Sequence, residues 1–127
     1  MSVTREVVLP VDPDELWPAV TEAEQLSDWF GARVDRDLEP GAVVRFTGED
    51  ERMAVVGGME PGRRLSWDWW PADGSAAPSH VEVVLEPVED GTRLTVTETG
   101  PVAPEAGTRF GGLPGRLEAR ARAAVRA

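Results

Sequence analysis

The sequence predicts a single α+β domain in which one strand, two short helices, six further strands and a closing helix follow in the order β-α-α-β(6)-α. Two capped segments between residues 11 and 31 carry helix signals. From residue 32 to residue 99, apolar and polar residues alternate between glycine-containing turns, which is typical of antiparallel strands with one buried face. At 127 residues the chain has room for one hydrophobic core and not for two.

The first strand and the first helix are expected at either side of a proline-containing turn. Residues 3–9 are rich in β-branched side chains and predict a strand. Pro13 suits the first position of a helix, and Asp12 before it is expected to cap the free amides with its side chain. Pro18 deletes one backbone hydrogen bond a turn later, so this helix is predicted to be short and to end near Val20.

A second short helix is predicted directly after the first. Residues 21–24 read TEAE, the pattern of a capping box. Leu26, Trp29 and Phe30 then stand at positions i, i+3 and i+4 and share one helix face. Gly31 is placed to end the helix.

Six strands are predicted in the central part of the chain because Glu-Pro-Gly and Asp-Gly turn signals separate alternating segments. They are expected at residues 32–37, 42–48, 52–59, 63–70, 79–87 and 92–99. Leu65, Trp67 and Trp69 then lie on one face of their strand. Gly57 and Gly58 interrupt a strand pattern and are interpreted as a bulge. A closing helix is expected near the C-terminus, where Leu113 and Leu117 recur at helical spacing.

Composition and charge exclude several classes of partner. The chain carries 23 acidic and 13 basic residues, and its formal charge is −10. A field of this sign repels nucleic-acid phosphates and anionic lipid surfaces, so neither nucleic acid nor membrane is an expected partner. No run approaches the ~18 apolar residues of a membrane span, and the N-terminal residues lack the apolar segment of a secretion signal. A cytoplasmic location is therefore expected.

The sequence also lacks the motifs of several kinds of catalytic site. There is no cysteine, which removes disulfides, thiolate metal sites and thiol nucleophiles together. The serines stand outside any G-x-S-x-G motif, and no glycine-rich phosphate loop occurs. The acidic run at 49–51 lacks the spacing of a calcium loop and is interpreted as a hairpin tip. We expect no metal, no cofactor and no covalent catalysis.

Three segments carry a resemblance to a known family: VDPDELWPAVTEAEQLSDWF at 11–30, RRLSWDWW at 63–70 and DGTRLTVTETG at 90–100. Their succession resembles the START-like (SRPBCC) superfamily, in particular homologues of the activator of the 90-kDa heat-shock-protein ATPase. The resemblance implies a helix-grip fold, in which a curved antiparallel sheet packs on a C-terminal helix over a cavity. That superfamily includes ligand carriers, polyketide cyclases and dehydratases, lipid-transfer domains and co-chaperone domains, so the fold alone does not fix the function.

Aromatic residues suggest where a ligand would bind. The chain has five tryptophans and no tyrosine, and several of these rings fall on expected inward faces. An aromatic-lined pocket between the sheet and the helices is one interpretation, and a solid core of touching rings is the other. The expected lining residues come from the second helix, the sheet and the closing helix: Trp29, Phe30, Phe46, Val55, Trp67, Trp69, Phe110, Leu113 and Leu117.

Four polar residues on the predicted strands could take part in chemistry: Arg45, Asp68, His80 and Glu98. All four alternate with apolar neighbours and are expected to face solvent. A bulge or a change of register that turned one of them inward would supply the polar group that orients a ligand.

Three functions follow, in order of preference. The first is non-catalytic binding of a small hydrophobic or aromatic molecule. The second is an enzyme resembling the polyketide cyclases or dehydratases, which requires an inward-facing His80, Asp68 or Glu98. The third is a chaperone-accessory module, which the resemblance alone suggests and for which the chain has no room for a separate chaperone-binding domain. A homodimer is compatible with each.

Overall fold

The computed structural model describes residues 2–30, 32–48 and 51–100. Two helices follow the first strand: α1 (Pro13–Thr21) and α2 (Ala23–Phe30). The strands are β1 (Ser2–Leu9), β2 (Arg33–Val34), β3 (Val43–Thr47), β4 (Glu51–Glu60), β5 (Arg64–Pro71), β6 (Ser79–Val88) and β7 (Gly91–Thr99). Each predicted strand and each of the first two helices is present, whereas the expected closing helix lies outside the described residues.

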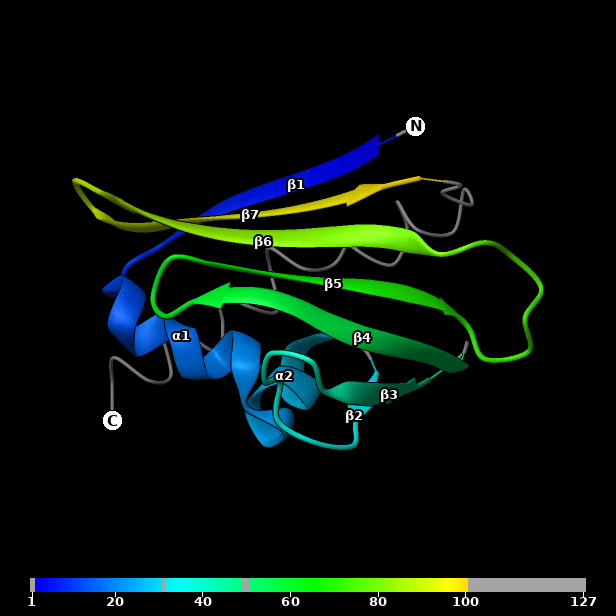
Figure 1. The fold of residues 1–127 in the computed structure, drawn as a ribbon. Coiled ribbons are helices and arrows are strands. Elements are labelled where there is room, and N and C mark those ends of the chain that lie inside the picture. Colours follow the sequence, from blue (N-terminus) through cyan, green and yellow to red (C-terminus); the bar gives the residue numbers. More distant parts are fainter. Residues whose placement is uncertain (1, 31, 49–50, 101–127) are drawn as a thin grey trace.

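The seven strands form one curved antiparallel sheet in the order β1-β7-β6-β5-β4-β3-β2 (Figure 1). Strands β2 to β7 form a continuous meander, since each pairs with the next along the chain. The first strand instead pairs with the last, from Ser2 opposite Thr99 to Leu9 opposite Thr92. This curled sheet with few helices is the helix-grip architecture that the sequence predicts.

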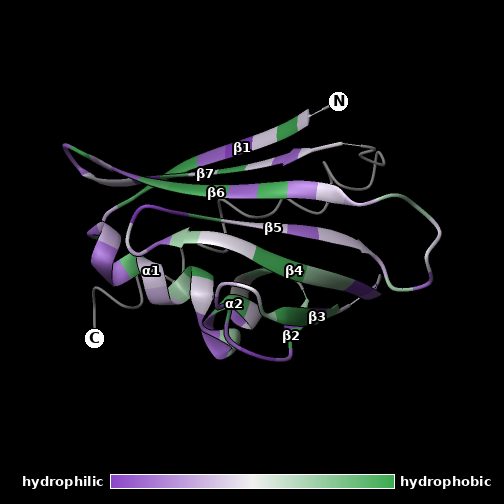
Figure 2. Ribbon diagram, in the orientation of Figure 1, coloured by the Kyte–Doolittle hydropathy of each residue, from purple (hydrophilic) through white to green (hydrophobic). Residues whose placement is uncertain are grey.

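One face of the sheet is buried and the other is exposed, because side chains alternate along each strand. On β5, Leu65, Trp67 and Trp69 are buried, whereas Asp68 between the two tryptophans is exposed. Figure 2 shows the same alternation of hydrophobic and hydrophilic residues along the strands. Burying each large side chain on the inner face stabilises the fold by about 1.5–3 kcal/mol.

The first helix is capped by backbone atoms instead of by a side chain. The carbonyl of Asp12 accepts hydrogen bonds from the amides of Glu15 and Leu16, at 3.0 Å each, and the Asp12 side chain makes no capping bond. The predicted Asp12 side-chain cap is therefore wrong. The helix runs past Pro18 to Thr21, as expected for a short helix that tolerates one missing bond.

The second helix is capped from a distant part of the chain. The amide of Ala23 donates a 2.7 Å hydrogen bond to Oδ1 of Asp37, while the Thr21 hydroxyl donates to the carbonyl of Trp17. The predicted capping box at 21–24 is therefore wrong, because Thr21 is the last residue of α1 and its hydroxyl bonds back into that helix. None of the described helices has the length and apolar character needed to cross a membrane.

The predicted bulge in β4 is confirmed. The pairing of β4 with β5 shifts between Val56 and Met59, which flank Gly57 and Gly58. A Cβ on Gly57 would lie 2.9 Å from the hydroxyl of Ser66, so the close approach of β5 favours glycine there.

Candidate functional site

Four aromatic side chains meet on the buried face, at the side of the sheet that α2 covers. Phe30 comes from the last turn of α2, Phe46 from β3, and Trp67 and Trp69 from β5. The ring centre of Phe30 lies 5.4 Å from that of Phe46, 6.3 Å from Trp67 and 6.1 Å from Trp69. Trp67 and Trp69 are 5.8 Å apart at 71°, a T-shaped arrangement that the ring quadrupoles favour. We call these four residues the aromatic cluster.

A carboxylate lies against the aromatic cluster inside the protein. The Glu98 side chain projects from β7, and the residue is only 1% exposed. The indole Nε1 of Trp69 donates a 2.7 Å hydrogen bond to its Oε2. The other oxygen, Oε1, is buried and has no hydrogen-bond partner among the described residues. Burial of a carboxylate with a free oxygen is costly, and this atom therefore needs an explanation.

A second buried polar atom lies in the same row of the sheet. Trp67 on β5 stands opposite Val81 on β6, and Val81 stands opposite Glu98 on β7. All three side chains are buried on the inner face. The indole Nε1 of Trp67 also has no hydrogen-bond partner in the described part of the chain. One unpaired donor and one unpaired acceptor thus flank an apolar residue.

The expectation that Glu98 faces solvent is wrong, and the signal that would have placed it is in the sequence. Leu94, Val96 and Glu98 are separated by two residues each, so they share one face of β7. The intervening Thr95 and Thr97 lie on the other face. Period-two alternation therefore buries Glu98 together with its apolar neighbours, whatever its own polarity.

The other polar candidates lie on the outer face, as expected. Asp68 and His80 are directly opposite one another on β5 and β6, and Nδ1 of His80 is 2.9 Å from Oδ1 of Asp68. Both side chains are about half exposed or more. Arg45 is also exposed and forms a 3.0 Å ion pair with Glu51. These side chains are therefore on the side of the sheet away from the aromatic cluster.

Val55 is a correction to the expected lining. It is 37% exposed and stands opposite Val43 and Asp68 on the outer face. On β4 the inward positions are Ala54 and Val56, one residue to either side. The assignment was off by one residue, which in a strand moves a side chain to the opposite face.

The remaining lining residues are not described by the structure. Trp29 belongs to α2, and its side chain lies outside the described part. Phe110, Leu113 and Leu117 also lie outside the described residues. Of the nine expected lining residues, the structure brings together Phe30, Phe46, Trp67 and Trp69.

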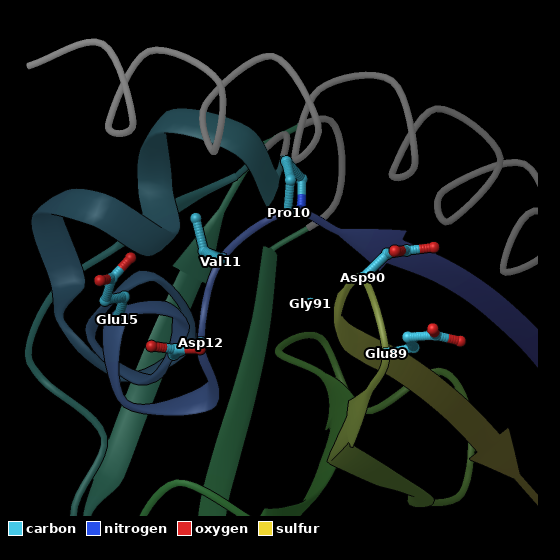
Figure 3. A pocket seen from close by; sticks show the side chains of 7 residues that line it. All are labelled: Pro10, Val11, Asp12, Glu15, Glu89, Asp90 and Gly91. Atoms are coloured by element: carbon cyan, nitrogen blue, oxygen red, sulfur yellow. The ribbon is translucent and has the colours of Figure 1, made fainter.

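A hollow of about 780 Å³ opens at the other end of the molecule, where β1 runs into α1 (Figure 3). Asp12 and Glu15 lie on its helix side, and Glu89 and Asp90 lie on the side of the β6–β7 turn. This open, acidic surface differs from the aromatic cluster, which is buried. Within the described residues no group of three or more potential ligands could hold a metal ion.

The charged groups of the loop between β5 and β6 are unrelated to the buried carboxylate. Hydrogen bonds from the side chain and the backbone amide of Ser75 hold the pKa of Asp73 below its ordinary value. Asp73 is fully solvent-exposed, so this interaction orders the loop locally.

Several solved structures share the fold. DynU16, a protein of the dynemicin biosynthetic locus, is 26% identical with a TM-score of 0.84, over 95% of this chain and 47% of its own. This chain thus spans about half the length of DynU16. CalU16 from Micromonospora echinospora is 24% identical with a TM-score of 0.77, over 95% of this chain and 74% of its own.

A third solved structure has the same fold. The structure of the Aha1 dimer from Colwellia psychrerythraea is 16% identical with a TM-score of 0.77, over 93% of this chain and 96% of its own. No curated protein matches the chain. A sequence model of one family matches residues 10–113. The match covers most of the chain, including the aromatic cluster and Glu98. The chain belongs to the family of Activator of Hsp90 ATPase homolog 1-like proteins.

Proposed function

We propose that this protein binds a small apolar or aromatic molecule on the buried face of its sheet, next to the aromatic cluster, without transforming it. The observation that carries the proposal is the buried Glu98, whose Oε1 has no partner in the described residues, beside four packed rings. Large rigid rings with a few polar groups are typical of small-molecule sites.

A solid apolar core explains the rings and leaves the polar atoms unexplained. An unsatisfied buried donor or acceptor costs about 1–3 kcal/mol, and a charged one costs more. Oε1 of Glu98 and Nε1 of Trp67 each carry such a cost. A bound molecule that hydrogen-bonds to them removes it, so the same atoms that destabilise the empty protein favour the complex.

The relatives support a small-molecule role. DynU16 is named for its place in a biosynthetic locus, and its likeness to this chain extends to 26% identity. The family is named after an activator of the Hsp90 ATPase, and a chaperone-accessory role of this chain stays a prediction. The Aha1 structure is that of a dimer, so we also propose that this chain can form a homodimer, which light scattering on the purified protein would test.

The proposal is tested by a substitution that places a larger side chain inside the proposed binding site. Val81 lies between Trp67 and Glu98 and is fully buried. If a cavity lies above it, Val81→Phe occupies that space, leaves the free energy of unfolding nearly unchanged and abolishes ligand binding. In a solid core the same substitution overpacks the interior and costs about 1–3 kcal/mol.

Binding is measured by native mass spectrometry and calorimetry with flavones, polyaromatic compounds and fatty acids. Val84→Phe serves as the matched control, because Val84 lies on the same strand and faces outward. We expect the wild type and Val84→Phe to bind one of these classes at micromolar concentration and Val81→Phe to bind none. A wild type that binds no compound, together with a destabilised Val81→Phe, would contradict the proposal.

A second candidate function is an enzyme of the polyketide cyclase or dehydratase kind. Glu98 favours it, since a buried carboxylate with a free oxygen is placed to accept a proton from a ligand. The test is turnover of a β-ketothioester that mimics a polyketide chain, followed by mass spectrometry. Product formation that Glu98→Gln abolishes would support the enzyme, and binding without turnover would support the carrier.

A further inference from the structure

We infer that the ligand is an aromatic molecule with a hydroxyl group that donates a hydrogen bond to Oε1 of Glu98 and a carbonyl oxygen that accepts one from Nε1 of Trp67. This inference rests on the proposed function, since it names the chemistry of the molecule held at that site. It follows from which atoms of the two side chains are already used and which are not.

The hydrogen bonds that these side chains already make define which hydrogen-bonding groups the ligand must supply. Oε2 of Glu98 accepts the indole N–H of Trp69 at 2.7 Å, which holds the carboxylate in place. Oε1 is left to accept, and the indole N–H of Trp67 is left to donate, with no partner for either among the described residues. A tryptophan N–H can only donate and a carboxylate oxygen accepts, so a ligand at this site must supply one donor and one acceptor.

The need for both a donor and an acceptor excludes several classes of ligand. An ammonium group satisfies the carboxylate but has no lone pair for Trp67, and a carboxylate ligand satisfies Trp67 but is repelled by Glu98. The formal charge of −10 also opposes anionic ligands in general. A neutral molecule that carries both a hydroxyl and a carbonyl oxygen meets both requirements without burying a second charge.

Trp67 and Glu98 lie in one row that crosses the inner face of the sheet. Trp67 and Glu98 are two strands apart, which is about 10 Å between backbones at about 4.8 Å per strand. The residue between them, Val81, is apolar. The two polar residues thus flank an apolar one, and the aromatic cluster lies beside them.

The test uses two flavones that differ in one proton donor. Both 6-hydroxyflavone and 6-methoxyflavone carry the same carbonyl, but only the hydroxyl can donate to Oε1 of Glu98. We expect calorimetry to give about tenfold tighter binding of the hydroxyl compound to the wild type. In Glu98→Gln, the side-chain amide can keep its oxygen on Trp69 and present an N–H to the ligand. Either flavone can accept from that N–H, so the ratio of the two affinities should fall to about one.

Two further variants separate the hydrogen bonds. Trp67→Phe removes the donor to the common carbonyl, so it should weaken both flavones by a similar factor and leave their ratio near tenfold. Glu6→Gln makes the same change of charge on the exposed face of β1 and should leave both affinities as in the wild type. Circular dichroism establishes that each variant is folded before titration.

The outcomes distinguish this inference from the proposed function. If flavones bind but the hydroxyl compound has no advantage, or if its advantage survives in Glu98→Gln, the assignment of Glu98 is wrong while binding of aromatic molecules stands. If no aromatic compound binds the folded wild type, the proposed function is wrong and this inference is overturned with it.

Discussion

The hydrogen bond between Trp69 and Glu98 joins two strands that are not neighbours. Trp69 lies on β5 and Glu98 on β7, with β6 between them. The bond crosses the inner face of the sheet, in a dry environment where hydrogen bonds to charged groups contribute about 1.5–3 kcal/mol each. Both residues are therefore expected to affect stability as well as ligand binding.

We predict that Trp69→Phe is markedly more destabilising than Trp67→Phe. Each substitution keeps an aromatic ring and removes one indole N–H, but only the N–H of Trp69 is bonded to the buried carboxylate. Its loss leaves Glu98 with no donor from the described residues and should cost about 2 kcal/mol more than the loss at Trp67. Urea unfolding of the two variants measures the difference. Equal losses would mean that Trp69 is not what compensates the buried carboxylate.

The sequence predicts which face of the sheet a strand residue occupies wherever the period-two alternation is followed to the end of the strand. It places Leu94 and Val96 correctly, and the same parity places Glu98 with them. Glu98 is expected to face solvent as a charged residue that alternates with apolar neighbours, yet it shares the parity of Leu94 and Val96 and the fold buries it. Functional sites are where such a conflict between chemistry and position is expected, since a buried carboxylate is retained in spite of its cost.

At the scale of elements, the turns were easier to predict than the helix caps. Glycine-containing turns depend on residues next to each other in sequence, and with the alternation between them they place the six strands of the meander within a few residues. The cap of α2 depends on Asp37, which lies 14 residues beyond Ala23, on the far side of β2 in the sequence. The residues at 21–24 alone therefore could not predict that Asp37 caps this helix.

The turn between β6 and β7 supplies a prediction for one glycine. Gly91 has φ of +142°, and a Cβ there would lie 1.9 Å from the backbone oxygen of Leu9. The turn therefore lies too close to the end of β1 for any side chain at this position. Gly91→Ala should therefore cost about 3 kcal/mol or more, because the backbone of one segment must move.

The matched control for this prediction is Gly58→Ala. A Cβ on Gly58 would have no heavy atom within 4 Å, so this variant should remain close to the wild type in urea unfolding. Circular dichroism of Gly91→Ala in buffer gives the folded fraction directly if the variant is too unstable to titrate. A Gly91→Ala protein as stable as Gly58→Ala would show that β1 does not need this close approach.

At the scale of the whole molecule, the order of the strands and the net charge differ in how far the sequence predicts them. The pairing of the first strand with the last requires the two ends of the meander to meet, and the sequence alone does not state which strands become neighbours. The resemblance to a known family implies a curved antiparallel sheet, and the structure supplies the order of its strands. Charge is a sum over the chain, so it could be read from composition with no knowledge of the fold.

We predict that salt stabilises the protein near neutral pH. With 23 acidic and 13 basic residues, self-repulsion outweighs the surface ion pairs, such as those of Arg93 with Glu6 and Glu86. Raising sodium chloride from about 20 mM to about 300 mM shortens the screening length and should raise the thermal midpoint by about 2–5 °C. Near pH 4.5, the isoelectric point calculated from the sequence, this gain should disappear. A midpoint that falls with salt at neutral pH would show that the ion pairs dominate.

The placement of Trp67 and Trp69 makes the protein a candidate optical sensor. Both indoles lie on one strand, within the aromatic cluster and beside the atoms proposed to hold the ligand. A flavone absorbs light in the range in which tryptophan emits, so a bound flavone would take up their excitation energy. The unlabelled protein would then signal hydroxylated aromatic compounds in solution by a loss of its own near-ultraviolet emission, without an attached dye.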